Sequence, residues 1–143
     1  MKKLLVAVAL TLSVAACAEG SKSSWQQNYG KTFYEPDPGT AAVYIIRDDP
    51  GTDTTPIYVT MGRQQVVSLT GQSWTRLNLP PSFYDFRAYG TQGSTELVVT
   101  VNAGQSRFFL AAPKAPDGAE LLELSQGDGR RLVRKGQVVA NTY

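Results

Sequence analysis

Few residues in this chain could perform chemistry, and the most informative of them is its single cysteine, Cys17. The sequence contains no histidine, which is the commonest general base and the commonest zinc ligand in proteins. A serine triad of the usual kind is therefore excluded. The remaining candidates are the Cys17 thiol, a few carboxylates and a basic cluster near residue 130.

Cys17 ends a segment with the proportions of a secretory signal peptide. Two lysines precede the uncharged run 4–16, which is shorter than the roughly 20 apolar residues that cross a bilayer. The last residues of the segment, Val-Ala-Ala-Cys at 14–17, resemble the bacterial lipobox. The resemblance implies a lipoprotein signal peptide over 1–16, a diacylglyceryl group on the Cys17 thiol and cleavage before Cys17, so that no thiol is left for nucleophilic catalysis.

The expected anchor also predicts a location. One acyl chain binds a membrane only reversibly, at about 0.8 kcal/mol per buried methylene, whereas several chains on one residue hold it stably. Gram-negative lipoproteins kept in the inner membrane often have aspartate after the cysteine, but this chain has Ala18. The resemblance thus favours the periplasmic face of the outer membrane over the inner membrane.

Charge and composition narrow the class of partner. The fourteen Lys and Arg include Lys2 and Lys3, so twelve basic and twelve acidic residues remain over 17–143. Without a basic excess we expect no nucleic-acid partner. A chain of this length can form one domain and a tether, and it has no second cysteine for a disulfide.

Residues 17–40 are predicted to be the lipidated N-terminus and a tether, because they are rich in Gly, Ser and Pro. As a flexible chain they would span about 25–30 Å. Trp25, Tyr29 and Phe33 recur every four residues, with Tyr34 alongside. We expect these rings to pack on the domain or lie at the lipid interface, and a partner-binding peptide is the alternative.

Short alternating runs with turns between them fill residues 41–124 and predict an all-β, antiparallel sandwich of seven to eight strands, prealbumin- or immunoglobulin-like. Runs 56–61 and 64–69 predict a hairpin. The expected strands are 41–47, 56–61, 64–69, 73–79, 83–89, 95–101, 106–112 and 119–124. The expected inward residues of the last long strands are Tyr84, Phe86, Ala88, Leu97, Val99, Val101, Phe108, Leu110 and Ala112.

The tail, residues 125–143, has two interpretations. Ser125 could cap a short helix that buries Leu132 and Val133 and ends at Gly136. A hairpin through residues 127–129 is the competing interpretation, because two glycines weaken an isolated helix. The helix is slightly favoured.

Four segments resemble a bacterial lipoprotein family known as domain of unknown function 2846. They are VYIIR, PIYVTMGRQQVVSL, LNLPPSFYDFRAY and LVVTVNAGQSRFFL, and they lie within residues 41–124. Ser82 stands where this family usually has glycine after the proline corner. The resemblance implies a β-sandwich on a lipid anchor and supplies no catalytic residue.

Two groups of carboxylates are candidate reactive sites. Asp48, Asp49 and Asp53 could suggest a calcium loop, but the regular ligand spacing of an EF-hand is missing, so a solvated turn is favoured. Asp85 and Glu96 could form an acid pair for glycan hydrolysis, given a cleft. Arg87 shares the face of Asp85, and Arg76 is expected nearby. An exposed, salt-bridged face is therefore the preferred interpretation. We expect no catalytic residue, no cofactor and no metal.

A basic cluster near the end could meet anionic lipid headgroups or the acids of another protein, although a solvated helix face is the simpler interpretation. Its members are Arg130, Arg131, Arg134 and Lys135.

The sequence therefore predicts a lipid-anchored, non-enzymatic module that binds or scaffolds an envelope protein, with no small-molecule substrate. The alternative is a glycan- or peptidoglycan-binding module. It would use exposed rings among Trp25, Tyr29, Trp74 and Tyr89.

Overall fold

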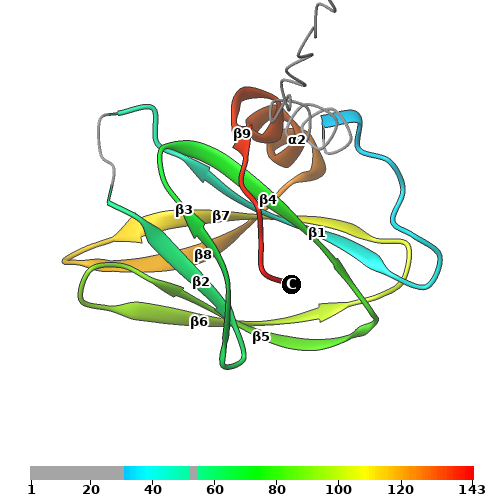
Figure 1. Ribbon diagram of the computed structural model, residues 1–143, viewed down its shortest axis with the longest axis horizontal. Helices are drawn as coiled ribbons and strands as arrows, with labels where there is room; N and C mark the ends of the chain where they lie inside the picture. The colour runs from blue at the N-terminus through cyan, green and yellow to red at the C-terminus, as the bar shows by residue number, and fades with distance from the viewer. Residues whose placement is uncertain (1–30, 52–54) are drawn as a thin grey trace, which may run out of the picture.

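Two stacked β-sheets and the helix α2 make up most of the described part of the chain, residues 31–51 and 55–143, in a computed structural model (Figure 1). The alternating apolar runs form the strands, and Gly- or Pro-containing turns separate most of them. The elements are β1 (Ala41–Asp48), β2 (Ile57–Met61), β3 (Gln64–Leu69), β4 (Gln72–Leu79), β5 (Ser82–Tyr89), β6 (Ser94–Val101), β7 (Ser106–Lys114), β8 (Gly118–Leu124), α2 (Gln126–Lys135) and β9 (Gln137–Val138).

The strands divide into a five-stranded sheet, β8-β7-β1-β4-β9, and a four-stranded sheet, β3-β2-β5-β6. β1 pairs with β7 and β4 pairs with β9 in parallel, and the other pairings are antiparallel. The predicted all-β sandwich is confirmed, and so is the predicted β2–β3 hairpin.

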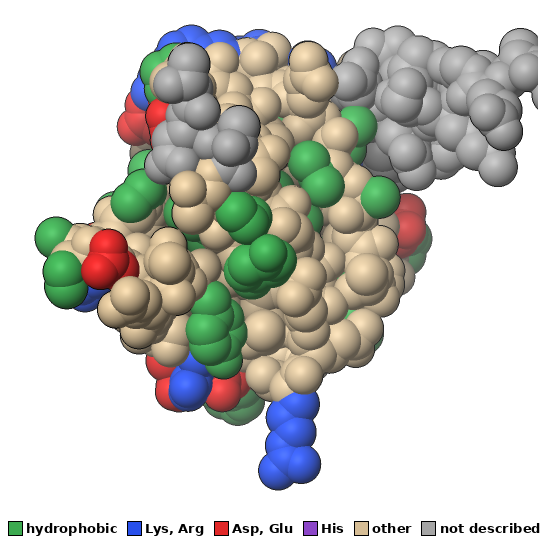
Figure 2. Space-filling model, turned by 60° about the vertical axis from the view of Figure 1, so that its left-hand side comes forward, with side chains coloured by type: hydrophobic (Ala, Val, Ile, Leu, Met, Phe, Trp, Pro, Cys, Tyr) green, Lys and Arg blue, Asp and Glu red, His purple; other side chains and the backbone are tan. Residues whose placement is uncertain are grey.

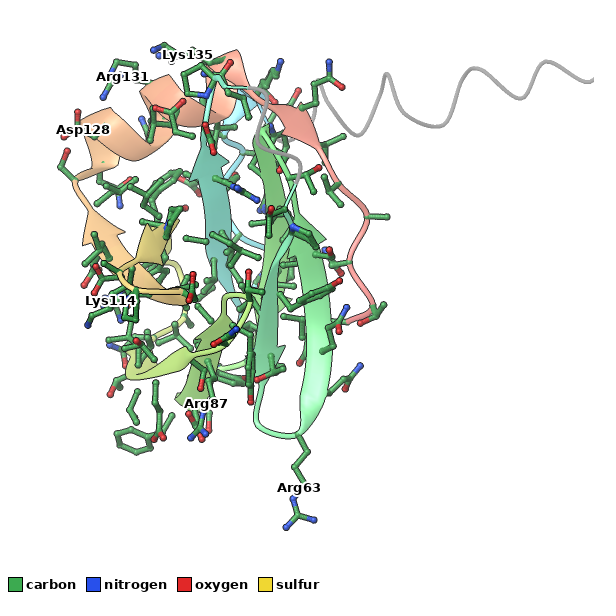
Figure 3. The ribbon with its side chains drawn as sticks, turned by 90° about the vertical axis from the view of Figure 1, so that its left-hand side faces the viewer. Arg63, Arg87, Lys114, Asp128, Arg131 and Lys135 are labelled. Atoms are coloured by element: carbon green, nitrogen blue, oxygen red, sulfur yellow. The ribbon has the colours of Figure 1, made fainter. Side chains whose placement is uncertain are left out.

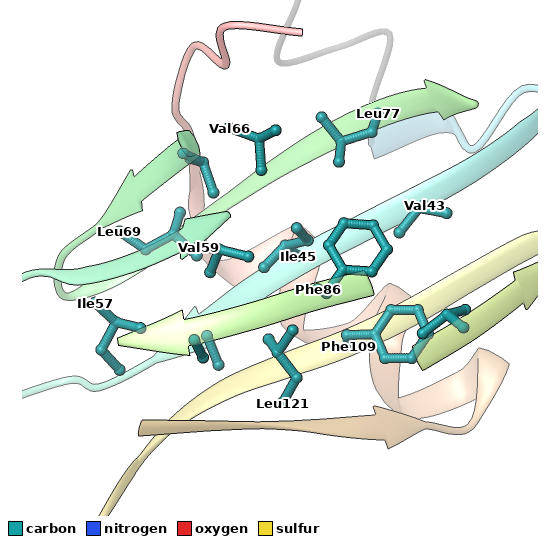
Figure 4. Close-up of a cluster of buried hydrophobic side chains, with 14 of the residues drawn as sticks. Val43, Ile45, Ile57, Val59, Val66, Leu69, Leu77, Phe86, Phe109 and Leu121 are labelled. Carbon is teal, nitrogen blue, oxygen red and sulfur yellow. The ribbon is translucent and has the colours of Figure 1, made fainter. Parts of the chain in front are cut away.

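The main core lies between the two sheets. Side chains from both sheets interdigitate there, among them Phe86 from β5 and Phe109 from β7 (Figure 4). Alternation explains this core, because every second residue of a strand points to the same face. The predicted inward residues Phe86, Ala88, Val99 and Val101 are all buried in it.

A second core covers the outer face of the five-stranded sheet. Tyr44 stacks on Phe108, with ring centroids 4.6 Å apart and planes 12° apart, and Trp74 lies 6.1 Å from Tyr44. α2 and Phe33 complete this cluster. Phe33, from the segment predicted to be a tether, therefore packs on the domain as expected, whereas Tyr34 is exposed. Trp25 and Tyr29 lie outside the described residues.

The prediction for β7 was wrong about which face meets the sandwich interior. Phe109 and Ala111 lie in the core between the sheets, whereas Phe108 lies under α2 and Leu110 packs against that second cluster. The reason is that β7 lies between β1 and β8 in a sheet whose faces are both covered. The alternation of apolar and polar residues therefore carries little information there.

α2 confirms the helix over the hairpin for the tail. The Ser125 hydroxyl accepts a hydrogen bond from the backbone N–H of Asp128 at 3.1 Å, and the helix ends at Gly136. Gly129 is required by packing, because a Cβ there would lie 2.2 Å from Cγ of Phe108. The glycine that weakens the isolated helix thus lets it approach the sheet closely.

The last residues connect the two sheets. The Asn141 side chain donates to the Thr75 hydroxyl and to the carbonyl of Arg76 on β4, both at 2.9 Å. The backbone N–H of Thr142 donates to the carbonyl of Val66 on β3 at 3.0 Å. Among the described residues, no helix is long and apolar enough to cross a membrane.

Candidate interaction surface

Among the described residues, α2 packs against β1, β4 and β7 of the five-stranded sheet, whereas the outer face of the four-stranded sheet exposes several large side chains. Four large hydrophobic side chains are exposed on this face. Their exposed fractions are 74% for Phe83, 61% for Val98, 40% for Tyr58 and 36% for Tyr89. We call this surface, with Asp85, Arg87 and Glu96 among its members, the bare face.

The strand register arranges the bare face. Tyr58 of β2 lies directly opposite Tyr89 of β5, and such cross-strand neighbours have Cβ atoms about 4.5–5.5 Å apart. Arg87 lies opposite Glu96 and forms an ion pair with it. Figure 3 shows Arg87 pointing outward at the end of the molecule remote from α2. A pair of tyrosine rings therefore adjoins a charged pair.

The charged pair on this face is electrostatically ordinary. The hydrogen bond from Arg87 to Glu96, and then the charge of Glu96, raise the pKa of Arg87. The guanidinium therefore stays positive throughout the physiological range. The pair is more than a third exposed on both sides, so it contributes little to stability and is available to a partner.

On the side of the molecule that Figure 2 shows, the exposed hydrophobic side chains form separate groups. The side of the molecule shown in Figure 2 has several distinct groups of hydrophobic side chains among polar atoms, with most charged side chains toward its margins. Surfaces that mix aromatic, aliphatic and charged groups in this way suit a reversible partner better than a permanent apolar interface.

The structure places the predicted glycan-binding rings differently from one another. Trp74 is only 1% exposed, because α2 and Tyr44 cover it, so its expected role in an exposed platform was wrong. Tyr89 lies on the bare face, and Tyr58, which sequence reasoning missed, pairs with it. The one sequence signal for the exposure of Tyr58 is its place in β2 between Ile57 and Val59, which point to the opposite face. Trp25 and Tyr29 lie outside the described residues, as does Cys17.

Asp85 and Glu96 share the bare face but do not lie opposite each other. Asp85 lies opposite Val98, and Glu96 is engaged with Arg87. Neither carboxylate lines either of the two cavities beside the β7–β8 loop. Arg76, expected nearby, lies in the other sheet with its Cζ 5.6 Å from the centre of the Tyr44 ring. That expectation was wrong because β4 pairs with β1, not with β5.

The acidic loop after β1 is occupied by interactions within the protein. Asp48 accepts from the Gln72 side chain at 2.8 Å, and Asp49 pairs with Arg47 at 3.4 Å and accepts from the N–H of Gly51 at 3.0 Å. Asp53 lies outside the described residues. Within residues 31–51 and 55–143, no three His, Cys, Asp or Glu side chains gather in a way that could hold a metal ion.

Two cavities, of about 450 and about 320 Å³, flank the β7–β8 loop and share residues 114–118. Arg47 lines the larger cavity and is only 2% exposed. Its guanidinium donates to the carbonyls of Thr55 and Leu69, so this buried cation is already held by the protein. A Cβ on Gly90 would lie 2.5 Å from the Asp117 carbonyl oxygen, which shows how closely the neighbouring loop docks.

The predicted basic cluster lies on α2. Arg130 and Arg134 place their Cζ atoms 5.4 and 5.3 Å from the centre of the Phe33 ring, and Arg131 pairs with Asp128 at 3.2 Å. The hydrogen bond from Ser125, and then Arg131, lower the pKa of Asp128.

The fold defines a class of protein, a two-sheet β-sandwich with a helix over one outer face. No protein-family model matches the chain, and no curated protein matches it.

Proposed function

We propose that this chain is a lipid-anchored bacterial envelope lipoprotein and that its sandwich is a non-enzymatic module that binds another envelope protein. Cys17 would be acylated and held at the periplasmic face of the outer membrane. The lipobox resemblance of residues 14–17 and the family resemblance over 41–124 support the anchor and the class. The bare face carries the proposal of binding.

The composition of the bare face favours a protein partner. Tyrosine, phenylalanine and arginine are enriched in protein interfaces, and aromatic anchors supply much of the binding energy. Here Phe83, Tyr58 and Tyr89 project from paired strands, so their backbone is already ordered before binding. A preorganised surface loses less conformational entropy on association.

A photo-crosslinking amino acid at Phe83 tests this function in intact cells. We expect it to capture one discrete envelope protein. Leu122 provides a matched control, because it is 44% exposed and lies in the other sheet. Equal capture from both positions, or capture of no protein from Phe83, would contradict the proposal.

One observation favours a second candidate, a glycan-binding module. Tyr58 and Tyr89 expose a pair of rings beside Arg87 and Glu96, which combines apolar ring surface with polar groups for hydroxyls. Sedimentation with purified peptidoglycan tests it. We expect the double variant Tyr58→Ala/Tyr89→Ala to lose sedimentation and Leu122→Ala to retain it. No sedimentation of the unaltered protein would reject this candidate.

The anchor has its own test. We expect mass spectrometry of the N-terminal peptide to show an acylated Cys17, and a globomycin-type inhibitor of lipoprotein cleavage to leave the precursor uncut. The Cys17→Ser variant should lose membrane attachment. A free Cys17 thiol in the exported protein would reject the lipoprotein assignment.

A further inference from the structure

The outward surface of α2 carries a concentration of positive charge. Arg130, Arg131, Arg134 and Lys135 lie within six residues, and Asp128 is the one acidic residue of the helix. Figure 3 shows Arg131 and Lys135 on the outer side of α2, away from the sheets, whereas Arg63 and Arg87 lie at the opposite end of the molecule. We call the four basic side chains the cationic surface.

Phe33 connects the cationic surface to the N-terminal segment. Its ring centre lies 6.0 Å from that of Tyr44 and 6.2 Å from that of Phe108, so it is anchored in the second core. Arg130 and Arg134 lie over the same ring. The N-terminal segment therefore meets the domain beside α2.

The length of chain before Phe33 limits how far α2 can lie from an anchor at Cys17. Phe33 lies sixteen positions after Cys17. A flexible chain of that length has a root-mean-square span of about 20–24 Å and reaches at most about 58 Å when fully extended. An acyl group on Cys17 would thus hold the cationic surface within that reach of the bilayer and raise its effective concentration there.

We propose that the cationic surface rests on anionic phospholipid headgroups when the protein is anchored. This inference rests on the proposed acylation of Cys17. Arg131 and Lys135 contact the headgroups, while Arg130 and Arg134 remain over Phe33 and add their charge at short range. The bare face, on the other sheet, is then directed away from the membrane toward a partner.

The strength of the contact follows from the number of cations. Each Lys or Arg close to an anionic membrane surface strengthens binding about fivefold. The attraction decays within a Debye length, about 8 Å at physiological ionic strength and about 3 Å in 1 M salt. The contact is therefore weak without the acyl anchor and salt-sensitive with it.

A fluorescence experiment on the full acylated protein tests the orientation. With Cys17 acylated, a cysteine introduced at Gln137, beside α2, or at Arg63 is the only free thiol to label. The vesicles contain phosphatidylcholine alone or with about a third phosphatidylglycerol, plus a bilayer quencher. We expect the Gln137 probe to be quenched more strongly on anionic vesicles, and the Arg63 probe to show no such increase.

Charge reversal tests which residues are responsible. Arg131→Glu/Lys135→Glu should abolish the dependence on anionic lipid, because it removes two cations and adds two anions. The control, Arg63→Glu/Lys114→Glu, changes the net charge equally at positions away from α2 and should preserve the dependence. Equal quenching of the Gln137 probe on both vesicle types would overturn the inference, as would equal effects of the two double variants.

The outcomes separate this inference from the proposed function. Mass spectrometry of the same sample reports acylation of Cys17 independently of orientation. An acylated protein with no preference for anionic vesicles overturns the inference and leaves the anchor intact. A protein whose Cys17 is not acylated overturns both. Crosslinking of Lys135 to an acidic protein, without lipid dependence, would assign the cationic surface to that protein and overturn the lipid contact.

Discussion

The two outer faces of the sandwich carry similar aromatic residues but use them differently. The five-stranded sheet presents Tyr44, Trp74 and Phe108, which α2 and Phe33 cover completely. The four-stranded sheet presents Tyr58, Phe83 and Tyr89, which remain exposed. The difference arises because residues 126–135 supply a cover for one face only.

This comparison shows that residue type alone does not decide burial. One set of rings stabilises the domain, because it removes apolar area from water at about 25 cal/mol per Å². The other set contributes little to folding and keeps its apolar area for a partner. Paired substitutions, one on each face, test this difference.

The largest contrast is expected between two phenylalanines. Phe108→Ala should lower the free energy of unfolding by about 3–5 kcal/mol, because it leaves a cavity under α2. Phe83→Ala should change it by less than about 0.5 kcal/mol, because Phe83 is exposed. Urea unfolding of both variants measures the difference, and equal losses would refute the assignment of the two faces.

Two glycines of α2 give the next contrast. Gly129→Ala should destabilise the protein by about 1–3 kcal/mol, because the new methyl group would overlap Phe108. Gly127→Ala should stabilise it by up to about 1 kcal/mol, because its nearest neighbour is the Ser125 hydroxyl at 4.0 Å. Thermal unfolding measures the stability of both variants. If both substitutions changed stability in the same direction, the packing of Gly129 against Phe108 would be contradicted.

The cap of the covering helix should have a smaller effect. Ser125→Ala removes the acceptor for the Asp128 N–H and should cost about 1 kcal/mol of unfolding free energy. Ser94→Ala, at an exposed position of β6, provides the comparison and should be close to neutral. Chemical denaturation that ranks Ser94→Ala as more harmful would argue against the cap.

The smallest effect is a pH dependence at the same end of α2. Folding lowers the pKa of Asp128, so its charged form contributes stability above the ordinary value of 3.8, and this is lost as pH falls through the folded pKa. Asp128→Asn should therefore be less stable than the unaltered protein at neutral pH, and the difference should vanish in acid. Denaturation across this pH range measures it, and a constant difference would contradict the role of the charge.

The bare face explains why much of the fold could be predicted. In β5 and β6 one side meets the core and the other meets water, so the buried positions are all apolar or aromatic and identify Phe86 and Val99 as inward. The outward positions carry charged residues as well as Phe83 and Val98. β1 and β7 are covered on both sides, and this signal disappears. Phe108 and Phe109 are both buried, in different cores, and no local pattern distinguishes them.

The candidate site was predictable only in part, for a similar reason. The exposure of Tyr89 follows from its alternate position, but the burial of Trp74 depends on a helix more than 50 residues later in the chain. The partnership of Tyr58 with Tyr89 depends on which strands pair, and local sequence does not specify that. Arg76 was misplaced for the same reason.

The central position of β1 has a consequence for biosynthesis. Ala41–Arg47 is a run of seven buried residues without proline, and both of its neighbours, β4 and β7, are translated later. Until residue 110 has been synthesised, β1 cannot pair with β7, and its apolar side chains and one of its edges stay exposed. Exposed segments of this kind aggregate readily. A nascent chain of this protein should therefore need a chaperone until its second half is complete.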